Sequence, residues 1–326
     1  MQALVLLFIC SVAGELPTVF LLGCPKCAST SLWSALVQQP ELCPATPVPP
    51  YMAMSAKELH FFSNLAGRFR LGVSWYKGNF NRSRLLLDGH VNADGCQFVD
   101  GSPSYLDKAQ FPSTAQRMHA TYPPLLRQRL RLIAILREPL SLLVSFFNYF
   151  HETYTPLRGR TFPQWVGMWG QVGALIAGNP VVPAHLSIAD WMEQLQPFWF
   201  HFSPSNVFVV DQRLVITEFH SIMRGLADFI GVKFSLPPHA KLPSENRGGE
   251  NQSLRWWHIS SLGHLPNALC MRLVSAFAGR NLALLVKLRD QRQRGLAAVG
   301  QPEFDGFASV ACNESLVESG TRSKGR

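Results

Sequence analysis

The chain has 326 residues, 47% of them hydrophobic, so it can bury a sizeable core, most simply as one α/β domain with inserted loops. Its formal net charge of +9 and isoelectric point near 9.4 favour anionic partners. Nucleic acid is not a predicted partner, because the sequence has no zinc-finger, recognition-helix or RRM signature and no alternation of basic and aromatic residues.

The first 13 residues are apolar and precede the first charge, at Glu15. Such a run is too short to span a bilayer, which needs about 20 residues. It is compatible with a signal peptide that lacks a positive start, and equally with an extra strand or a mis-set start codon. We expect residues 1–14 to be a possible signal peptide or short apolar N-terminus, and membrane association stays open.

The next segment predicts a phosphate-binding loop. An apolar strand at 18–22 is followed by the turn Gly-Cys-Pro-Lys-Cys-Ala-Ser-Thr and a helix at 31–38. Backbone N–H groups and the helix dipole converge at such a turn, and Lys26 adds a full charge. The nucleoside-triphosphate P-loop is not matched, because Lys26 comes three residues after Gly23 and Ala28 takes the second small position.

Two further segments carry polar residues suited to chemistry. A proline-rich connection at 40–50 leads to the run Lys-Glu-Leu-His-Phe-Phe, which contains Glu58 and His60. A strand predicted at 97–100 ends in Asp100 and continues as Gly-Ser-Pro-Ser-Tyr. On their own, Glu58 and His60 could equally be a surface carboxylate and a structural histidine.

A buried strand at 132–136 is expected to place Arg137 at its carboxyl end, and Pro139 suits the first turn of the next helix. On that helix one stripe is polar, and it consists of Ser141, Ser145, Asn148 and Glu152. The opposite stripe is apolar, and it consists of Leu142, Leu143, Phe146, Phe147 and Phe150. The spacing of Arg137 and Ser145 is compatible with a phosphate site or with a solvated helix face.

Together these segments resemble sulfotransferases that use 3′-phosphoadenosine 5′-phosphosulfate (PAPS), in the carbohydrate, heparan-sulfate-type branch. The resemblance covers roughly residues 18–290. It implies that PAPS is bound by the loop residues Lys26, Cys27, Ala28, Ser29 and Thr30. It also implies a 3′-phosphate site made by Arg137 and Ser145.

The resemblance further implies the chemistry of sulfuryl transfer to a hydroxyl or amine of a carbohydrate acceptor. Glu58 would be the general base, and Lys26 would stabilise the leaving phosphate. His60 and Asp100 would contact the acceptor. No metal site is expected, because Cys24 and Cys27 lack a second pair of ligands.

Three positions depart from the family pattern. Gly101 stands where many heparan-type members carry a lysine, Leu142 where arginine is frequent, and Phe147 where tyrosine is frequent. These departures keep open a second hypothesis, a catalytically impaired protein that binds the cofactor or a glycan.

The alternation of strands and helices predicts a single P-loop-like α/β domain at 15–298, with a central parallel sheet flanked by helices and a flexible tail at 299–326. A strand is expected at 206–211, and an amphipathic helix at 219–230 should be capped by Gly231. A helix at 186–202 and a closing segment at 273–285 resemble the family's C-terminal half. Candidates for its glycine loop lie at 246–249 and 260–264.

Features of secreted proteins are also present. Cys270 and Cys312 could form a disulfide, and N-x-[ST] sequons occur at Asn81, Asn251 and Asn313. We therefore expect a glycoprotein of the secretory pathway, in the Golgi lumen. The sequence does not identify the acceptor.

Overall fold

The computed structural model describes residues 15–48, 55–88, 95–150, 159–167, 187–237, 239–243 and 267–293. The chain divides into two compact units. The sheet unit comprises residues 1–136, 194–245 and 288–302, and the helical unit comprises 137–193, 246–287 and 303–326. The predicted N-terminal segment, the tail and both glycine-loop candidates lie outside the described residues.

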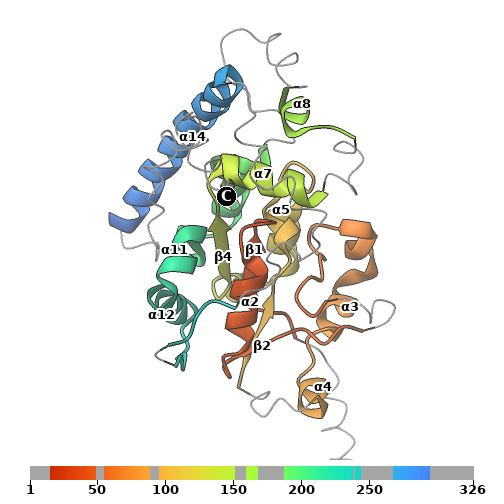
Figure 1. Cartoon of the computed structure of the whole chain (residues 1–326). Helices are drawn as coiled ribbons and strands as arrows, with labels where there is room; N and C mark the ends of the chain where they lie inside the picture. Colours follow the sequence, from red (N-terminus) through yellow and green to blue (C-terminus); the bar gives the residue numbers. More distant parts are fainter. Residues whose placement is uncertain are drawn as a thin grey trace, which may run out of the picture. The chain divides into compact units, whose positions relative to one another are not determined.

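The sheet unit is built on five parallel strands in the order β2-β3-β1-β4-β5 (Figure 1). In chain order they are β1 (Val19–Gly23), β2 (Leu42–Cys43), β3 (Gln97–Asp100), β4 (Arg131–Leu136) and β5 (Val207–Asp211). Every residue of β1 and β5 is buried, as expected for parallel strands covered on both faces. The predicted parallel α/β fold is confirmed.

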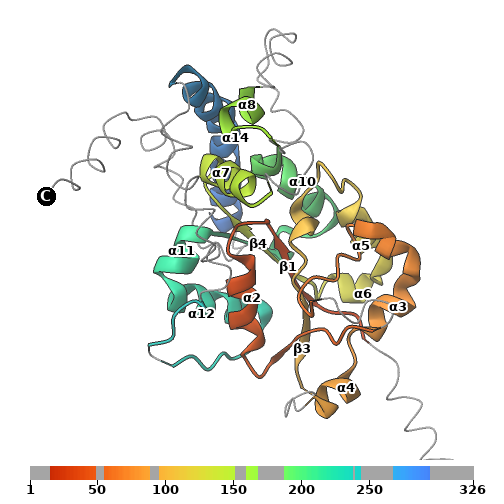
Figure 2. The ribbon, with the colours of Figure 1, turned by 45° about the vertical axis from the view of Figure 1, so that its right-hand side comes forward.

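Helices cover both faces of this sheet. Phe20 of β1 packs on Phe62 and Tyr122, with ring centroids 6.0 Å away in each case. Phe208 of β5 packs on Phe229 at 5.3 Å, and through the strand register it shares a face with Leu21, the residue after Phe20. Successive side chains of a strand point to opposite faces, so the two contacts lie on different sides of the sheet. Figure 2 shows α12 and α2 on one side and α5 and α3 on the other.

The helices of the sheet unit are mostly short. They are α2 (Ser29–Val37), η1 (Leu65–Leu71), α3 (Gly72–Gly78), α4 (Arg82–Leu87), η2 (Pro103–Leu106), α5 (Thr114–Thr121), α6 (Pro124–Arg127), η4 (Pro204–Asn206), α11 (Gln212–Thr217) and α12 (Phe219–Ile230). The predicted helix at 219–230 is confirmed, and Gly231 caps it with a φ of 82°. Its N–H donates to the Ala227 carbonyl.

The helical unit contains α7 (Pro139–Phe150), α8 (Phe162–Gly167), η3 (Ser187–Ala189), the first residues of α10 (Trp191–His201) and most of α14 (Asn267–Gln293). Pro139 begins α7 as predicted, and the Glu138 carboxylate accepts bonds from the N–H groups of Leu140 and Ser141. Four residues of the predicted apolar stripe of α7 are buried, namely Leu142, Leu143, Phe146 and Phe147, and Phe147 packs on Phe162 at 5.5 Å. Glu152 lies outside the described residues.

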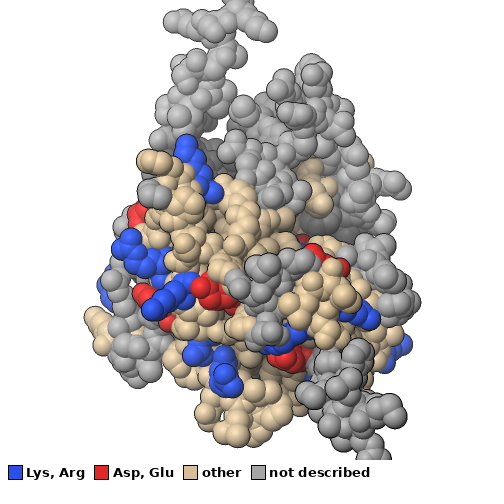
Figure 3. Space-filling view, turned by 90° about the horizontal axis from the view of Figure 1, so that it is seen from below, with Lys and Arg blue, Asp and Glu red and all other residues tan. Residues whose placement is uncertain are grey.

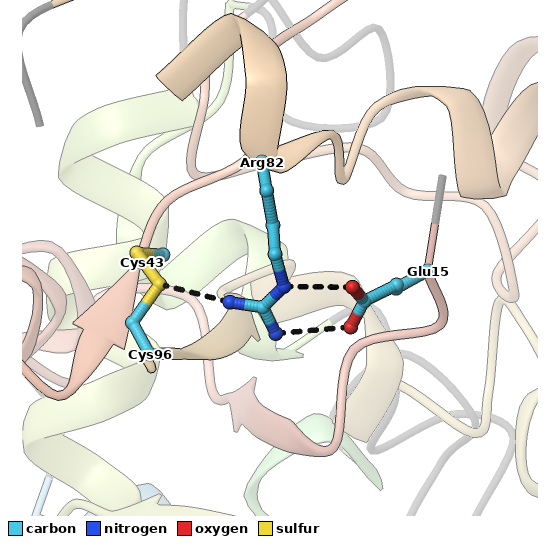
Figure 4. The surroundings of a disulfide bond; sticks show 4 residues. All are labelled: Glu15, Cys43, Arg82 and Cys96. Carbon is cyan, nitrogen blue, oxygen red and sulfur yellow. Dashed lines mark hydrogen bonds and ion pairs between the residues drawn. A yellow bond between two sulfur atoms is a disulfide. The ribbon is translucent and has the colours of Figure 1, made fainter. Parts of the chain in front are cut away.

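A disulfide between Cys43 and Cys96 joins the end of β2 to the residue before β3. The Arg82 guanidinium lies beside it and forms a two-pronged ion pair with Glu15, with Nε–Oε1 at 2.7 Å and Nη2–Oε2 at 3.0 Å (Figure 4). This pairing was not predicted from the sequence. The Cys270 side chain and Cys312 lie outside the described part of the structure, so that predicted disulfide stays a prediction.

Charges of both signs are interspersed on the face of the described residues seen in Figure 3. Two basic residues, the last of α6 and the first of β4, are engaged within the protein. Arg131 donates from Nε to the Phe229 carbonyl at 2.7 Å, and Arg127 contacts His119. Within the described ranges, no helix is both long and apolar enough to cross a membrane.

Candidate active site

The predicted phosphate-binding loop leaves the sheet at Gly23 and ends where α2 begins, at Ser29. The Cys24 N–H still bonds to β4, at the Ile135 carbonyl. Lys26 and Ala28 have left-handed backbones, with φ of 63° and 61°, and no side chain caps α2. The turn therefore delivers the uncapped start of a helix at the carboxyl end of the central strand, which is an anion-binding geometry.

Gly23 is required at the start of this loop. Its φ is 110°, and a Cβ atom there would lie 2.3 Å from the Pro103 carbonyl oxygen. Pro103 begins η2, three residues after the end of β3. Glycine thus allows the loop to pass against the backbone that follows β3.

The segment containing Glu58 has no regular secondary structure, but it runs beside the end of β3. The Gly101 N–H donates to the Lys57 carbonyl at 2.9 Å, and the His60 N–H donates to Ser102 Oγ at 2.8 Å. The Arg68 guanidinium donates to the Glu58 and Leu59 carbonyls. These bonds fix Glu58 next to the residues that follow β3.

Glu58 lies between two basic side chains. Its Oε1 is 2.5 Å from Lys57 Nζ and its Oε2 is 3.3 Å from His60 Nε2. Burial raises the pKa of Glu58, but the hydrogen bond with His60 and the charge of Lys57 outweigh it and bring the pKa to about 2. Burial lowers the pKa of Lys57, although Glu58 and Asp100 act in the opposite direction. The Glu58 carboxylate is therefore ionised at neutral pH and able to accept a proton.

Asp100 has a structural role instead of the predicted contact with the acceptor. It is fully buried, and its Oδ2 accepts bonds from Tyr76 and Tyr105, each at 2.7 Å. Its Oδ1 accepts a bond from the Ser102 hydroxyl, at 2.6 Å, and another from the Ser102 N–H. Burial raises the pKa of Asp100, although these bonds lower it. The contact predicted between Asp100 and a substrate hydroxyl is contradicted, because both oxygens are occupied and neither reaches solvent.

Other side chains fill the space beside Gly101, the position at which many heparan-type members carry a lysine. A Cβ atom at Gly101 would lie 2.6 Å from Trp33 Cδ1 and 2.9 Å from Lys57 Cγ. Trp33 is on α2, one turn after the phosphate-binding loop. Its buried Nε1 has no hydrogen-bond partner among the residues that the structure describes. The Trp33 indole therefore lies against the backbone of Gly101, the residue that follows β3.

Arg137 and Ser145 belong to the helical unit. Arg137 directly follows β4, as predicted, and its carbonyl accepts a bond from Trp191 Nε1 at 3.0 Å. Burial lowers the pKa of Arg137, although Glu138 beside it acts in the opposite direction. Ser145 is partly exposed on α7, whereas Leu142 is fully buried on its apolar stripe. Their grouping around one 3′-phosphate stays a prediction.

Sequence reasoning missed Ser63 and Ser104, which are hydrogen-bonded to each other and to His60, and Tyr76, which donates to Asp100. The bonds that join Ser104 to His60 and Ser63, and Tyr76 to Asp100, span 24 to 44 residues of the chain, so no local spacing marks them. No group of three or more His, Cys, Asp or Glu that could hold a metal ion occurs in the described ranges.

The model of the sulfotransferase domain family matches residues 16–252. Among solved structures, a sulfotransferase from Alicyclobacillus acidocaldarius superposes with a TM-score of 0.51 and 20% identity, over 82% of this chain and 93% of that one. The sulfotransferase domain of the curacin biosynthetic pathway gives 0.40 and 17%, over 68% and 76%. That of the Synechococcus PCC 7002 olefin synthase gives 0.40 and 16%, over 82% and 95%.

The search of curated proteins gives no match. The family model nevertheless covers well over half of the chain, and it includes both the phosphate-binding loop and the Glu58 segment. The Alicyclobacillus structure shares the fold. The chain therefore belongs to the sulfotransferase family and is a sulfotransferase enzyme.

Proposed function

We propose that this enzyme transfers a sulfuryl group from PAPS to a hydroxyl or amine of a carbohydrate acceptor, without a metal. PAPS is the usual donor in the family, and the uncapped start of α2 with Lys26 offers a site for its 5′-phosphosulfate. The observation that carries the proposal is the ionised Glu58 carboxylate, held by Lys57 and His60 next to the end of β3.

In the proposed reaction Glu58 accepts the proton of the attacking hydroxyl. The acceptor oxygen forms a bond to sulfur, and the bond from sulfur to the bridging phosphate oxygen breaks. The electron pair of that bond leaves with 3′-phosphoadenosine 5′-phosphate. Lys26 stabilises the growing charge on the phosphate, while Arg137 and Ser145 hold the 3′-phosphate. Because little covalent chemistry falls to the protein, positioning and electrostatics supply most of the rate.

The substitution Glu58→Gln tests the base. It keeps the size of the side chain but removes the proton acceptor, so transfer from [35S]-PAPS across a glycan panel should fall on the order of 10²–10⁴-fold. Binding of 3′-phosphoadenosine 5′-phosphate, measured by calorimetry, should stay largely intact. Normal turnover by this variant would refute the assignment.

A second candidate is a catalytically impaired protein that binds the cofactor or a glycan. It is favoured by the packing at Gly101, which leaves no room for the lysine of many heparan-type members. The same two assays separate the candidates. Calorimetric binding of the cofactor product without transfer to any acceptor of the panel supports the impaired protein.

We further propose a location in the lumen of the secretory pathway, in the Golgi. The Cys43–Cys96 disulfide supports this, because such bonds persist in oxidising compartments. Asn81, whose Oδ1 caps α4, is partly exposed at a sequon, which is compatible with glycosylation. Recovery of the protein in the cytosolic fraction of cells would contradict this location.

A further inference from the structure

The phosphate-binding loop contains a disulfide of its own. Cys24 and Cys27 are bonded to each other, with their Cα atoms 5.4 Å apart, and only Pro25 and Lys26 lie between them in the chain. The Cys27 N–H also donates to the Cys24 carbonyl at 3.3 Å. The turn that carries Lys26 is therefore closed twice, once through the backbone and once through sulfur.

This disulfide lies on the buried side of the loop. The side chains of Cys24 and Cys27 are fully buried, whereas Pro25, Lys26 and Ala28 are partly exposed. The Cys24 N–H bonds to a carbonyl of β4, so the first cysteine is fixed to the sheet. The bond thus connects the loop to the sheet from beneath and occupies none of the partly exposed positions, which stay available to an anion.

The loop needs such support because its backbone conformation is unfavourable. Lys26 and Ala28 have left-handed backbones, which residues with a Cβ atom adopt only at a cost. The nucleoside-triphosphate P-loop carries a glycine before its lysine, but this chain has no glycine between Gly23 and the start of α2. Residues in such conformations persist where the surrounding structure enforces them. A cross-link between Cys24 and Cys27 does so, because it excludes many other conformations of the turn.

We propose that the Cys24–Cys27 disulfide holds this loop in the conformation that binds the 5′-phosphosulfate of PAPS, so that affinity for the donor depends on the oxidation state of the two cysteines. This inference rests on the proposed function. The cysteines act through the backbone of Lys26 and the first turn of α2, and they are positioning residues.

The proposed dependence follows from the chemistry of the bond. A dithiol reductant gives two electrons and two protons to the S–S bond, which becomes two thiols, and the reductant is oxidised to its own disulfide. The opened turn then populates conformations that do not bind the donor. The apparent dissociation constant rises in proportion as the competent fraction falls.

Mass spectrometry of the full chain tests whether the bond forms. Free thiols are alkylated without reductant, and the denatured protein is digested with trypsin, which cleaves after Lys26, between the two cysteines. We expect Cys24 and Cys27 to carry no alkyl group and their peptides to separate only after reduction. Peptides that separate without reduction, each with an alkylated cysteine, would overturn the proposal.

Calorimetry with 3′-phosphoadenosine 5′-phosphate measures the effect on the loop. The affinity should fall about 10-fold in Cys24→Ala with Cys27→Ala, and by a similar factor in the parent protein after a dithiol has opened the bond. The reduced parent keeps every side chain, so it separates the cross-link from the packing of the two cysteines. Equal affinity of the oxidised and the reduced parent would overturn this inference and leave the proposed function standing.

Two controls make the result specific to the loop. Adenosine 3′-monophosphate lacks the 5′ group, so its affinity should be unchanged by reduction, and an equal loss of both ligands would overturn the proposal. Cys43→Ala with Cys96→Ala removes a disulfide outside the loop and should bind 3′-phosphoadenosine 5′-phosphate as the parent does. If the oxidised parent bound neither ligand, PAPS would be refuted as the donor, and this inference with it.

Discussion

Gly101 and Trp33 show how a single position changes the surroundings of the proposed base. Lys57, one of the two neighbours that an added Cβ atom would meet, is anchored through Nζ to Glu58. The Trp33 indole is rigid and has less freedom than a flexible side chain to move aside. Any side chain at position 101 is therefore in competition with both residues.

We predict that Gly101→Ala lowers the free energy of unfolding by about 1–3 kcal/mol, as overpacking does. Urea denaturation measures the change. Trp33→Leu opens the space, so the double variant, Gly101→Ala with Trp33→Leu, should lose less free energy of unfolding than the sum of the losses of the two single variants. Gly78→Ala is the control, since its Cβ atom would meet only Val48 Cγ2 at 3.9 Å, and it should not destabilise. Additive losses would contradict the shared space.

At the residue scale, Lys26, Glu58 and His60 could be proposed because each belongs to a contiguous motif that resembles one of the sulfotransferase family. It could not assign Asp100 correctly. Only the fold brings Tyr76, 24 residues away, to the Asp100 carboxylate and so converts a presumed ligand into a buried support. Polar groups paired across the chain leave no periodic signal in the sequence.

At the scale of elements, the loop before α2 depends on a residue with a left-handed backbone. Ala28 has a left-handed backbone, which costs a residue with a Cβ atom roughly 1–2 kcal/mol. The unfolded chain of a glycine variant is more flexible and offsets part of this cost.

We therefore expect Ala28→Gly to stabilise the protein by about 0.5–1 kcal/mol in thermal or urea unfolding. Ala35→Gly, within the same helix, is the matched control and should destabilise by about 1 kcal/mol or more. A destabilising effect of both substitutions would show that residue 28 does not adopt the left-handed conformation in solution.

Elements were predictable where the apolar pattern was strong. The strand at 97–100 and the helix at 219–230 were expected with the observed bounds, and β1, β4 and β5 within one residue at each end. In contrast, β2 has only two residues inside a proline-rich connection, too few for a pattern, and was expected to be loop. The helix after residue 186 begins later than expected, at Trp191, because η3 precedes it.

At the scale of the whole molecule, the Cys43–Cys96 bond closes a long stretch of chain. The two cysteines are 53 residues apart, and the link removes about 4 kcal/mol of chain entropy from the unfolded state. Sequence counting could not select this pair among seven cysteines, because proximity arises only when β2 and β3 pair.

Replacement of both cysteines, Cys43→Ala with Cys96→Ala, should lower the free energy of unfolding by about 4 kcal/mol in urea without reductant. Added reductant should narrow the difference, since it opens this bond in the parent protein only. If the parent and the variant were equally stable without reductant, the bond would not form in the mature protein.

The buried Asp100 also bears on how acceptor preference could diverge. Tyr105 donates to Asp100 and accepts from the Phe61 N–H at 3.1 Å, so the segment carrying Glu58 is secured from the interior of the sheet unit. Both bonds lie inside the sheet unit, between η2, β3 and the segment that contains Glu58. Exposed side chains outside these bonds can therefore be exchanged to admit a different acceptor while Glu58 stays in place, which makes them the natural place to engineer a new specificity.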